Sequence, residues 1–262
     1  QELQVSSLSI SWASSQIFIN LTNIVKSREV KKAFLIMTRI LYGVISIGLG
    51  HAIRSRVIID HLKKNKHKVM VITSHRVYDY YKKYYDEVYN IEGLELVFKK
   101  NSILNFKTII KNLQKASKGT YHKLMKVKER VNKFDPQIVI SDMETFSTFI
   151  AHDKNLPLIS IDNQHYLVYG NYRIPEIYRL SYFKALMIIK GIVLKAQNYL
   201  IMCLPGTSVV NKNGVYQIKP IIRDEILNAK SKNEDYIFVY QSTKTYDKLI
   251  ELLKRINYKF VV

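Results

Sequence analysis

The chain has 262 residues, of which 47% are hydrophobic and 24% charged, so a disordered or collagen-like chain is excluded. The single cysteine, Cys203, excludes a disulfide framework. A formal net charge of +20 favours phosphate-bearing partners, namely nucleic acid, anionic lipid or nucleotide sugars. The abundance of Lys together with Ile, Asn and Tyr supports the alternative that much of this charge is compositional bias.

The first part of the chain differs from the remainder in composition. Residues 1–36 combine a Ser-rich start with a basic patch at 26–32, and they lack the charged n-region and cleavage pattern of a signal peptide. Met37 stands directly before the first predicted strand. The sequence therefore predicts an extension over 1–36, outside a core domain that spans 37–222.

A glycine turn joins the first predicted strand, 39–47, to a predicted helix over 51–65. The turn reads Gly48-Leu49-Gly50-His51, a layout that places a ligand at the carboxyl end of a sheet. A dinucleotide fingerprint needs a third glycine where Ile53 stands, and no Gly-Lys-Ser/Thr of a phosphate loop is present. NAD and Walker-type ATP binding are therefore disfavoured. The alternative is that the turn only packs the helix on the strand, with His51 capping it.

Strands and helices alternate along the rest of the chain, which predicts an α/β fold: a Rossmann-like, mainly parallel sheet with helices on both faces. Further strands are predicted at 68–73, 94–98, 137–141, 157–161 and 199–203. Further helices are predicted at 76–85, 105–133, 144–154 and 176–197. Residues 211–233 are predicted to be a connector, followed by a strand over 236–240, a helix over 244–256 and the start of a strand at 259–262.

Polar side chains come directly after the fourth and fifth strands, at the same edge of the sheet as Gly48 and His51. Asp142 comes just after the fourth strand, either as the N-cap of the next helix or as a carboxylate in a cleft. The loop after the fifth strand contains Asn163, Gln164 and His165. Because folding gains little from gathering such groups there, a ligand-contacting role is favoured over a purely structural one.

Residues 180–204 are the most apolar stretch of the chain. Lys184, Lys190 and Lys195 interrupt it, so it does not resemble a membrane span. Ordinary packing against the sheet is the favoured interpretation. A basic helix lying on an anionic membrane surface is the alternative.

Four phrases together resemble the N-terminal half of a GT-B glycosyltransferase of the family-28-like and UDP-glucuronosyltransferase-like prokaryotic group. They are ILYGVISIGLGHAIRS, FDPQIVISDMET, LPLISIDNQH, and IKPIIRDEI followed by DYIFVYQST. The resemblance covers roughly 38–262. It implies two Rossmann-like domains across a cleft, with the acceptor on the N-terminal domain and a nucleotide-sugar donor on the C-terminal one.

The resemblance also implies residue roles and a reaction. A histidine after the first strand would be the general base, held by an aspartate after the fourth, and His51 and Asp142 fall at these places. The expected activity is metal-independent, inverting hexosyl transfer from a UDP-sugar or similar co-substrate to a hydroxyl, with no bound cofactor and no metal. Acceptor contacts are expected at Gly48, Gly50, Arg54, Asn163, Gln164 and His165.

The same resemblance predicts a linker over 223–235 and a truncated start of the donor domain over 236–262. A chain with so little of that domain is expected to be inactive alone. One alternative is a non-catalytic acceptor-binding subunit that needs a separate donor-domain chain. A basic nucleic-acid-binding protein is more remote, because only charge supports it, and no nucleic acid is expected. The expected location is cytoplasmic, with an anionic membrane surface and a lipid-linked or envelope glycan acceptor as further options.

Overall fold

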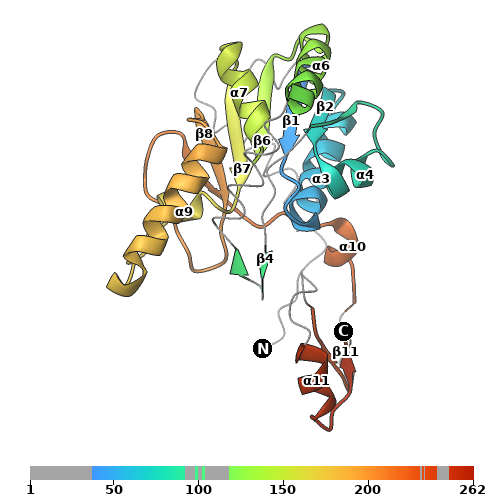
Figure 1. Ribbon diagram of the computed structural model, residues 1–262, viewed down its shortest axis with the longest axis vertical. Helices are drawn as coiled ribbons and strands as arrows, with labels where there is room; N and C mark the ends of the chain where they lie inside the picture. Colours follow the sequence, from blue (N-terminus) through green and yellow to red (C-terminus); the bar gives the residue numbers. More distant parts are fainter. Residues whose placement is uncertain are drawn as a thin grey trace.

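The computed structural model describes residues 37–91, 98–99, 102–103, 118–230, 232, 234–240 and 248–262. The predicted extension over 1–36 therefore lies outside the described residues, as do 94–97 of a predicted strand and 105–117 of a predicted helix. The described part is built around one seven-stranded sheet (Figure 1).

The sheet is parallel throughout, in the order β3-β2-β1-β6-β7-β8-β9. Its strands are β1 Arg39–Val44, β2 Lys68–Thr73, β3 Val88–Asn90, β6 Ile138–Asp142, β7 Leu158–Asp162, β8 Asn198–Met202 and β9 Val215–Ile218. After β1 the chain moves outward to β2 and β3, and then returns to β6 on the other side of β1. The strand order thus reverses between β1 and β6, and such switch points open a crevice at the carboxyl edge.

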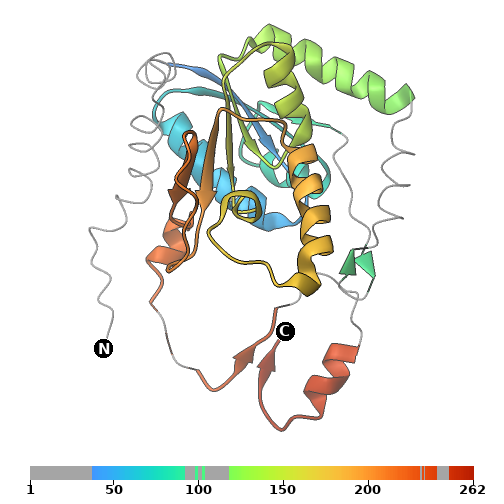
Figure 2. The same cartoon turned by 90° about the vertical axis from the view of Figure 1, so that its left-hand side faces the viewer.

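Helices cover both faces of this sheet, as predicted (Figure 2). They are α3 Leu49–Lys64, α4 His75–Tyr81, α6 Lys118–Phe134, α7 Thr145–Asp153, α8 Tyr166–Tyr169 and α9 Arg179–Ile192, with a 3-10 turn at Glu176–Tyr178 before α9. Alternate residues of a strand point to opposite faces. Tyr42 accordingly packs in one core cluster with Ile59 of α3, and Leu41 packs in another with Val131 of α6 and Ile150 of α7.

Two short edge strands differ from the predicted elements. α4 ends at Tyr81, whereas the helix was predicted to reach residue 85. β3 then lies in a segment that was predicted to be a connection without a strand. β9 lies inside the predicted connector 211–233 and pairs with β8. Both strands have only three or four residues and depend on backbone pairing with a neighbour, so their local pattern is weak. Phe98–Lys99 and Ser102–Ile103 form a separate antiparallel pair, β4 and β5, outside the main sheet.

The start of α7 packs closely on β1. Glu144 is the N-cap of α7, and its carboxylate accepts hydrogen bonds from the backbone N–H groups of Phe146 at 2.7 Å and Ser147 at 2.6 Å. A Cβ on Gly43 of β1 would clash with the Ser147 side chain, so only glycine allows this approach. The interpretation of Asp142 as the N-cap is therefore wrong, because the cap lies two residues later.

The C-terminal segment has the predicted strand–helix–strand order. β10 Ile237–Phe238 pairs in parallel with β11 Phe260–Val261, and α11 Lys248–Lys254 comes between them in the chain. This βαβ unit lies apart from the main sheet (Figure 1). A short helix, α10 Asp224–Leu227, occupies part of the predicted linker 223–235. The domain boundaries themselves stay a prediction.

Candidate active site

A histidine–aspartate pair lies at the switch point of the sheet. His51 is the third residue of α3, which comes after β1, and Asp142 is the last residue of β6, the strand next to β1. His51 Nδ1 lies 2.8 Å from Asp142 Oδ1, although the two residues are 91 positions apart in the chain. The parallel pairing of β1 with β6 brings the two residues together, because it places both carboxyl ends at one edge.

Asp142 is a fully enclosed carboxylate with several donors around it. Only 1% of its side chain is exposed. Arg54 donates from Nε to Oδ2 at 2.8 Å and from Nη2 to Oδ1 at 2.5 Å, and Ser55 Oγ donates to Oδ2 at 2.8 Å. Burial by itself would raise the pKa of Asp142, but the hydrogen bonds and charges of Arg54 and His51 outweigh it and lower that pKa. Asp142 is therefore held as an anion.

This arrangement fixes how the His51 ring is used. Nδ1 lies 2.8 Å both from Asp142 Oδ1, which only accepts hydrogen bonds, and from Arg54 Nη2, which only donates. In the tautomer that pairs the ring with the buried carboxylate, Nδ1 carries the hydrogen and donates to Asp142. Nε2 then keeps its lone pair and lies 3.1 Å from the Gln164 amide nitrogen, which donates to it. Gln164 Oε1 is buried and has no hydrogen-bond partner among the described residues. The side chain of His51 is 12% exposed, so the ring is shielded while its basic nitrogen faces a polar group.

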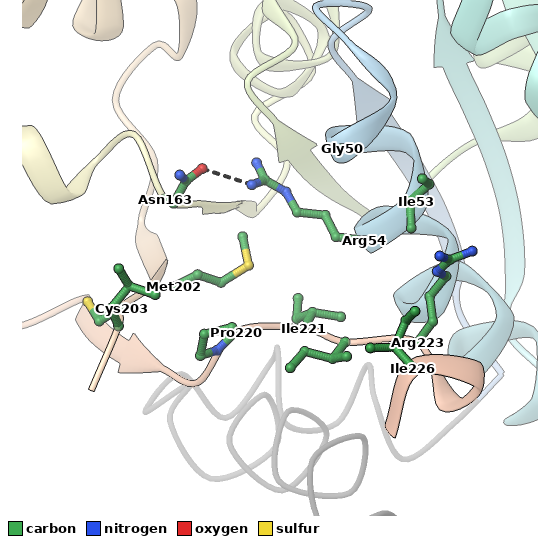
Figure 3. A pocket seen from close by; sticks show the side chains of 12 residues that line it. Gly50, Ile53, Arg54, Asn163, Met202, Cys203, Pro220, Ile221, Arg223 and Ile226 are labelled. Atoms are coloured by element: carbon green, nitrogen blue, oxygen red, sulfur yellow. Dashed lines mark hydrogen bonds between the residues drawn. The ribbon is translucent and has the colours of Figure 1, made fainter. Parts of the chain in front are cut away.

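Arg54 connects the pair to a cavity. Its Nη1 donates to Asn163 Oδ1 at 2.8 Å, and both side chains face a cavity of about 460 Å³ (Figure 3). Burial opposes the charge of Arg54, but the hydrogen bond and charge of Asp142 prevail, and the pKa of the guanidinium is raised. The cavity is mostly apolar, with Arg223 as a second cation. Its lining residues are Gly50, Ile53, Arg54, Asn163, Met202, Cys203, Leu204, Pro220, Ile221, Ile222, Arg223 and Ile226.

The predicted glycines occupy two different settings. Gly48 is the residue before α3 and has φ 80°, a conformation that favours glycine. Gly50 lines the cavity, and a Cβ built there would have no described atom within 4 Å. The space above Gly50 is thus open to a ligand, whereas Gly48 is required by the turn itself.

His165 follows Gln164 in the chain but has partners of its own. Its Nδ1 lies 2.7 Å from Asp162 Oδ2, its backbone N–H donates to Asp162 Oδ1, and Ser160 Oγ donates to the same carboxylate. The ring lies against Tyr199 at a centroid distance of 4.7 Å, and 3% of the side chain is exposed. This packing turns the ring inward, and the expectation that His165 contacts an acceptor stays a prediction.

Sequence reasoning missed several residues of the site. Ser55 was not predicted, although it stands four residues after His51 on α3 and donates to Asp142. The cavity wall formed by Pro220–Arg223 falls in the predicted connector and at the start of the predicted linker. An available signal was the apolar Ile221-Ile222 pair after a proline, which is unusual for a solvated connector. Among the described residues, no group of three or more His, Cys, Asp or Glu is arranged to hold a metal ion.

The fold and the switch-point site define an α/β protein of the GT-B type. The chain belongs to glycosyl transferase family 1, whose family model matches residues 38–262. This confirms the predicted resemblance to the N-terminal half of a GT-B glycosyltransferase. No curated protein sequence matches the chain.

One solved structure aligns with a TM-score above 0.5, which supports the same fold, and two others align with lower scores. The glycotransferase of kitacinnamycin aligns with a TM-score of 0.52 at 12% identity, over 85% of this chain and 64% of that one. MurG of Acinetobacter baumannii aligns with a TM-score of 0.44 at 10% identity, over 85% and 57%. LpCGTa, solved in complex with UDP, aligns with a TM-score of 0.46 at 14% identity, over 86% and 65%. The chain spans less than two thirds of the length of each of these proteins.

Proposed function

We propose that residues 37–222 form the acceptor-binding half of a glycosyltransferase, which moves a hexose from a nucleotide-sugar donor to an acceptor hydroxyl. Membership of glycosyl transferase family 1 supports this class of reaction. The observation that carries the assignment of roles is the contact of 2.8 Å between His51 Nδ1 and Asp142 Oδ1, a carboxylate that also binds Arg54 of the cavity wall. His51 is the general base, and Asp142 is the residue that positions it.

In the proposed reaction, His51 Nε2 takes the proton of the acceptor hydroxyl. The acceptor oxygen forms a bond to the anomeric carbon while the bond from that carbon to the diphosphate oxygen breaks. The nucleoside diphosphate leaves with the electron pair, and the proton later passes from Nε2 to solvent. A single displacement of this kind inverts the anomeric centre. A positioned base contributes roughly 10²–10⁴-fold to such a step.

Three neighbours decide how readily His51 accepts the proton. The N-terminus of α3 and the guanidinium of Arg54, whose Nη2 lies 2.8 Å from Nδ1, both disfavour a positive ring. Asp142 favours it, and its carboxylate is shared between His51 and Arg54.

Gln164 has a separate role in this proposal. Its amide donates to the lone pair of His51 Nε2, the atom that must receive the acceptor proton. An incoming hydroxyl therefore has to take the place of this amide. Arg54 and Asn163 join at the cavity wall and supply polar contacts for the rest of the acceptor.

The donor is proposed to be a UDP-sugar or a similar nucleotide sugar, used without a metal and held mostly by a second Rossmann-like domain. Residues 236–262 would be the beginning of that domain, after a linker over 223–235. The parallel pairing of β10 with β11 through α11 is the arrangement that such a beginning requires. A cytoplasmic location is proposed for this reaction.

The test is sugar transfer by the intact protein to hydroxyl acceptors from a panel of nucleotide sugars. His51→Ala is expected to lower kcat by roughly 10² or more, with donor binding nearly unchanged, because only the proton acceptor is lost. Asp142→Asn is expected to lower kcat less than His51→Ala, since it misorients the base without removing it. Equal kcat for the wild type and His51→Ala would overturn the assignment of the base.

A further inference from the structure

The first half of α9 presents an apolar face to solvent, contrary to the expectation that this helix is mainly packed. Leu180, Phe183 and Met187 are 66%, 60% and 58% exposed. Their spacing of three and four residues places them on one side of the helix. Ile189 and Ile192, on the opposite side, hold α9 to the body of the protein. The exposed face extends through Ile177 and Tyr178, in the turn before α9.

Basic residues border this face on both sides. Lys184 lies along one edge of the stripe of Leu180, Phe183 and Met187, and Lys190 lies along the other; both lysines are exposed. Glu176 is the only acidic residue between 170 and 195, and it pairs with Arg179 at 3.0 Å. The face therefore combines exposed apolar side chains with a net positive border.

These features match the chemistry of an anionic lipid surface. An amphipathic helix with apolar residues on one side and Lys or Arg at the margins lies in the plane of the headgroups. A second copy of the chain fits less well, because a two-fold contact through this face would bring the lysines of both copies together. None of the described helices is long and apolar enough to cross a membrane, so the contact would be with the surface.

We propose that α9 and the turn before it form a docking surface for an anionic membrane, here called the α9 face. The α9 face consists of Ile177, Tyr178, Leu180, Phe183 and Met187, with Lys184 and Lys190 at its edges. Phe183 and Met187 enter the apolar boundary of the lipid, and the two lysines bind phosphate-bearing headgroups. Membrane binding in this proposal does not depend on the chemistry of the active site.

The position of the α9 face adds a consequence for the substrate. The N-terminal end of α9 extends beyond the sheet on the side to which the carboxyl ends of the strands point (Figure 1), and Gly50, Arg54 and Asn163 of the cavity follow strands at that edge. Tyr182 on α9 donates from its hydroxyl to the Leu167 carbonyl at 2.9 Å, which ties the helix to α8, the short helix after β7. The membrane contact would hold the cavity near the lipid surface. Resting on the proposed function, this makes a membrane-borne hydroxyl compound the acceptor class.

The test is co-sedimentation of the protein with vesicles of phosphatidylcholine alone and of phosphatidylcholine with phosphatidylglycerol, at low and high salt. The wild type is expected to bind only the anionic vesicles and to dissociate as salt rises. Lys184→Glu/Lys190→Glu is expected to weaken binding at least ~10-fold, since each basic residue contributes about fivefold near such a surface. Phe183→Ser/Met187→Ser is expected to weaken it by a similar factor.

Matched control variants distinguish the effect of the α9 face from the effect of losing charge or apolar side chains anywhere on the surface. Lys126→Glu/Lys133→Glu makes the same charge change on α6, and Met125→Ser/Phe149→Ser removes exposed apolar side chains elsewhere. Circular dichroism checks that every variant is folded. The proposal is overturned if the wild type ignores anionic vesicles, or if the α6 charge variant loses as much binding as the α9 variant. It is also overturned if Phe183→Ser/Met187→Ser turns a dimer into a monomer in size-exclusion chromatography.

The two proposals can fail separately. If the α9 variants lose vesicle binding but still transfer sugar to a water-soluble acceptor, the docking surface is confirmed and the active site is shown to be intact. Conversely, His51→Ala is expected to bind vesicles as well as the wild type does and to lose sugar transfer. A protein that is complete with its donor-binding domain, binds vesicles and has no transferase activity would contradict only the proposed function.

Discussion

Two largely buried histidine–aspartate pairs lie at the carboxyl edge of the same sheet. They share one kind of hydrogen bond but differ in their sequence separation and in what surrounds the histidine ring. His51 Nδ1 lies 2.8 Å from Asp142, and His165 Nδ1 lies 2.7 Å from Asp162. The aspartates end the neighbouring strands β6 and β7. The first pair joins residues 91 positions apart, whereas the second joins residues three apart within one turn.

The two imidazole rings have different neighbours, and their proposed roles differ accordingly. His165 packs against Tyr199 and Tyr169, which leaves its pair to fasten the turn after β7. His51 has a polar neighbour at its free nitrogen, and Gly50 and Arg54 beside it line the cavity. A histidine–carboxylate contact is therefore not by itself a sign of catalysis. What distinguishes the candidate base is an Nε2 that faces the Gln164 amide, next to residues that line the cavity, instead of a ring packed on tyrosines.

The largest expected effect is on the stability of the first pair. Asp142→Asn leaves the largely buried Arg54 guanidinium without its carboxylate and should lower the free energy of unfolding by about 3–5 kcal/mol at neutral pH. Asp162→Asn should cost less, about 1–3 kcal/mol, because it weakens hydrogen bonds within one turn and leaves no buried guanidinium without its carboxylate. Urea unfolding monitored by circular dichroism measures both. A smaller loss for Asp142→Asn than for Asp162→Asn would contradict this ranking.

The same variant has a defined pH dependence. The pKa of Asp142 is lowered in the folded protein, so its contribution to stability is present above the ordinary carboxyl pKa of about 3.9 and is lost as pH falls through the lower, folded value. The stability difference between the wild type and Asp142→Asn should therefore shrink as the solution is acidified below about pH 4. A difference that stays constant through this range would show that the carboxylate is not specifically stabilised.

The second prediction contrasts the two histidines. His165→Ala removes a buried hydrogen bond and a ring packed on Tyr199, and should lower the free energy of unfolding by about 1–3 kcal/mol. Its kcat per folded molecule should stay within about twofold of the wild type, because the ring does not face the cavity. His51→Ala should give the opposite pattern, with kcat affected far more than stability. A fall in kcat for His165→Ala as large as that for His51→Ala would remove the distinction between the pairs.

The third prediction concerns the residue that faces the free nitrogen of His51. Gln164→Ala removes one neutral hydrogen bond and should change kcat/KM by about 3–10-fold. Gln164→Glu places a carboxylate that favours a protonated ring, so the acidic limb of the pH profile of kcat/KM should move to higher pH. Asn163→Ala, which alters the cavity but does not touch His51, is the control and should leave that limb in place. An unchanged profile in Gln164→Glu would contradict the contact with the base.

The smallest expected effect is at Gly50. The space there is open, so Gly50→Ala should change the free energy of unfolding by no more than about 0.5 kcal/mol while raising the KM of the acceptor. Gly43→Ala is the matched comparison, because its Cβ clashes with Ser147, and it should destabilise the protein by about 1–3 kcal/mol. An acceptor KM unaffected by Gly50→Ala would show that the acceptor binds away from this part of the cavity.

The sequence by itself determined the layers of the fold and the edge at which the site lies. Alternating buried strands and helices predict a parallel sheet, and in such a sheet the loops after the strands gather at one edge. This is why the segments around Gly48, Asp142 and Asn163 were predicted to meet. The two edge strands β3 and β9 were not predicted, since three or four residues carry little local pattern.

Only the tertiary structure decided which polar groups face the cavity and which face the core. The local patterns around His51 and His165 are alike, because each residue comes after a buried strand, beside polar or glycine residues, and only the family resemblance assigned the base to His51. The inward turn of His165 depends on Tyr199, from β8, and the partners of Asp142 come from α3, almost ninety positions away. The exposure of α9 depends likewise on how much of the helix the sheet can cover. Side-chain direction is set by contacts distant in sequence, which no local pattern contains.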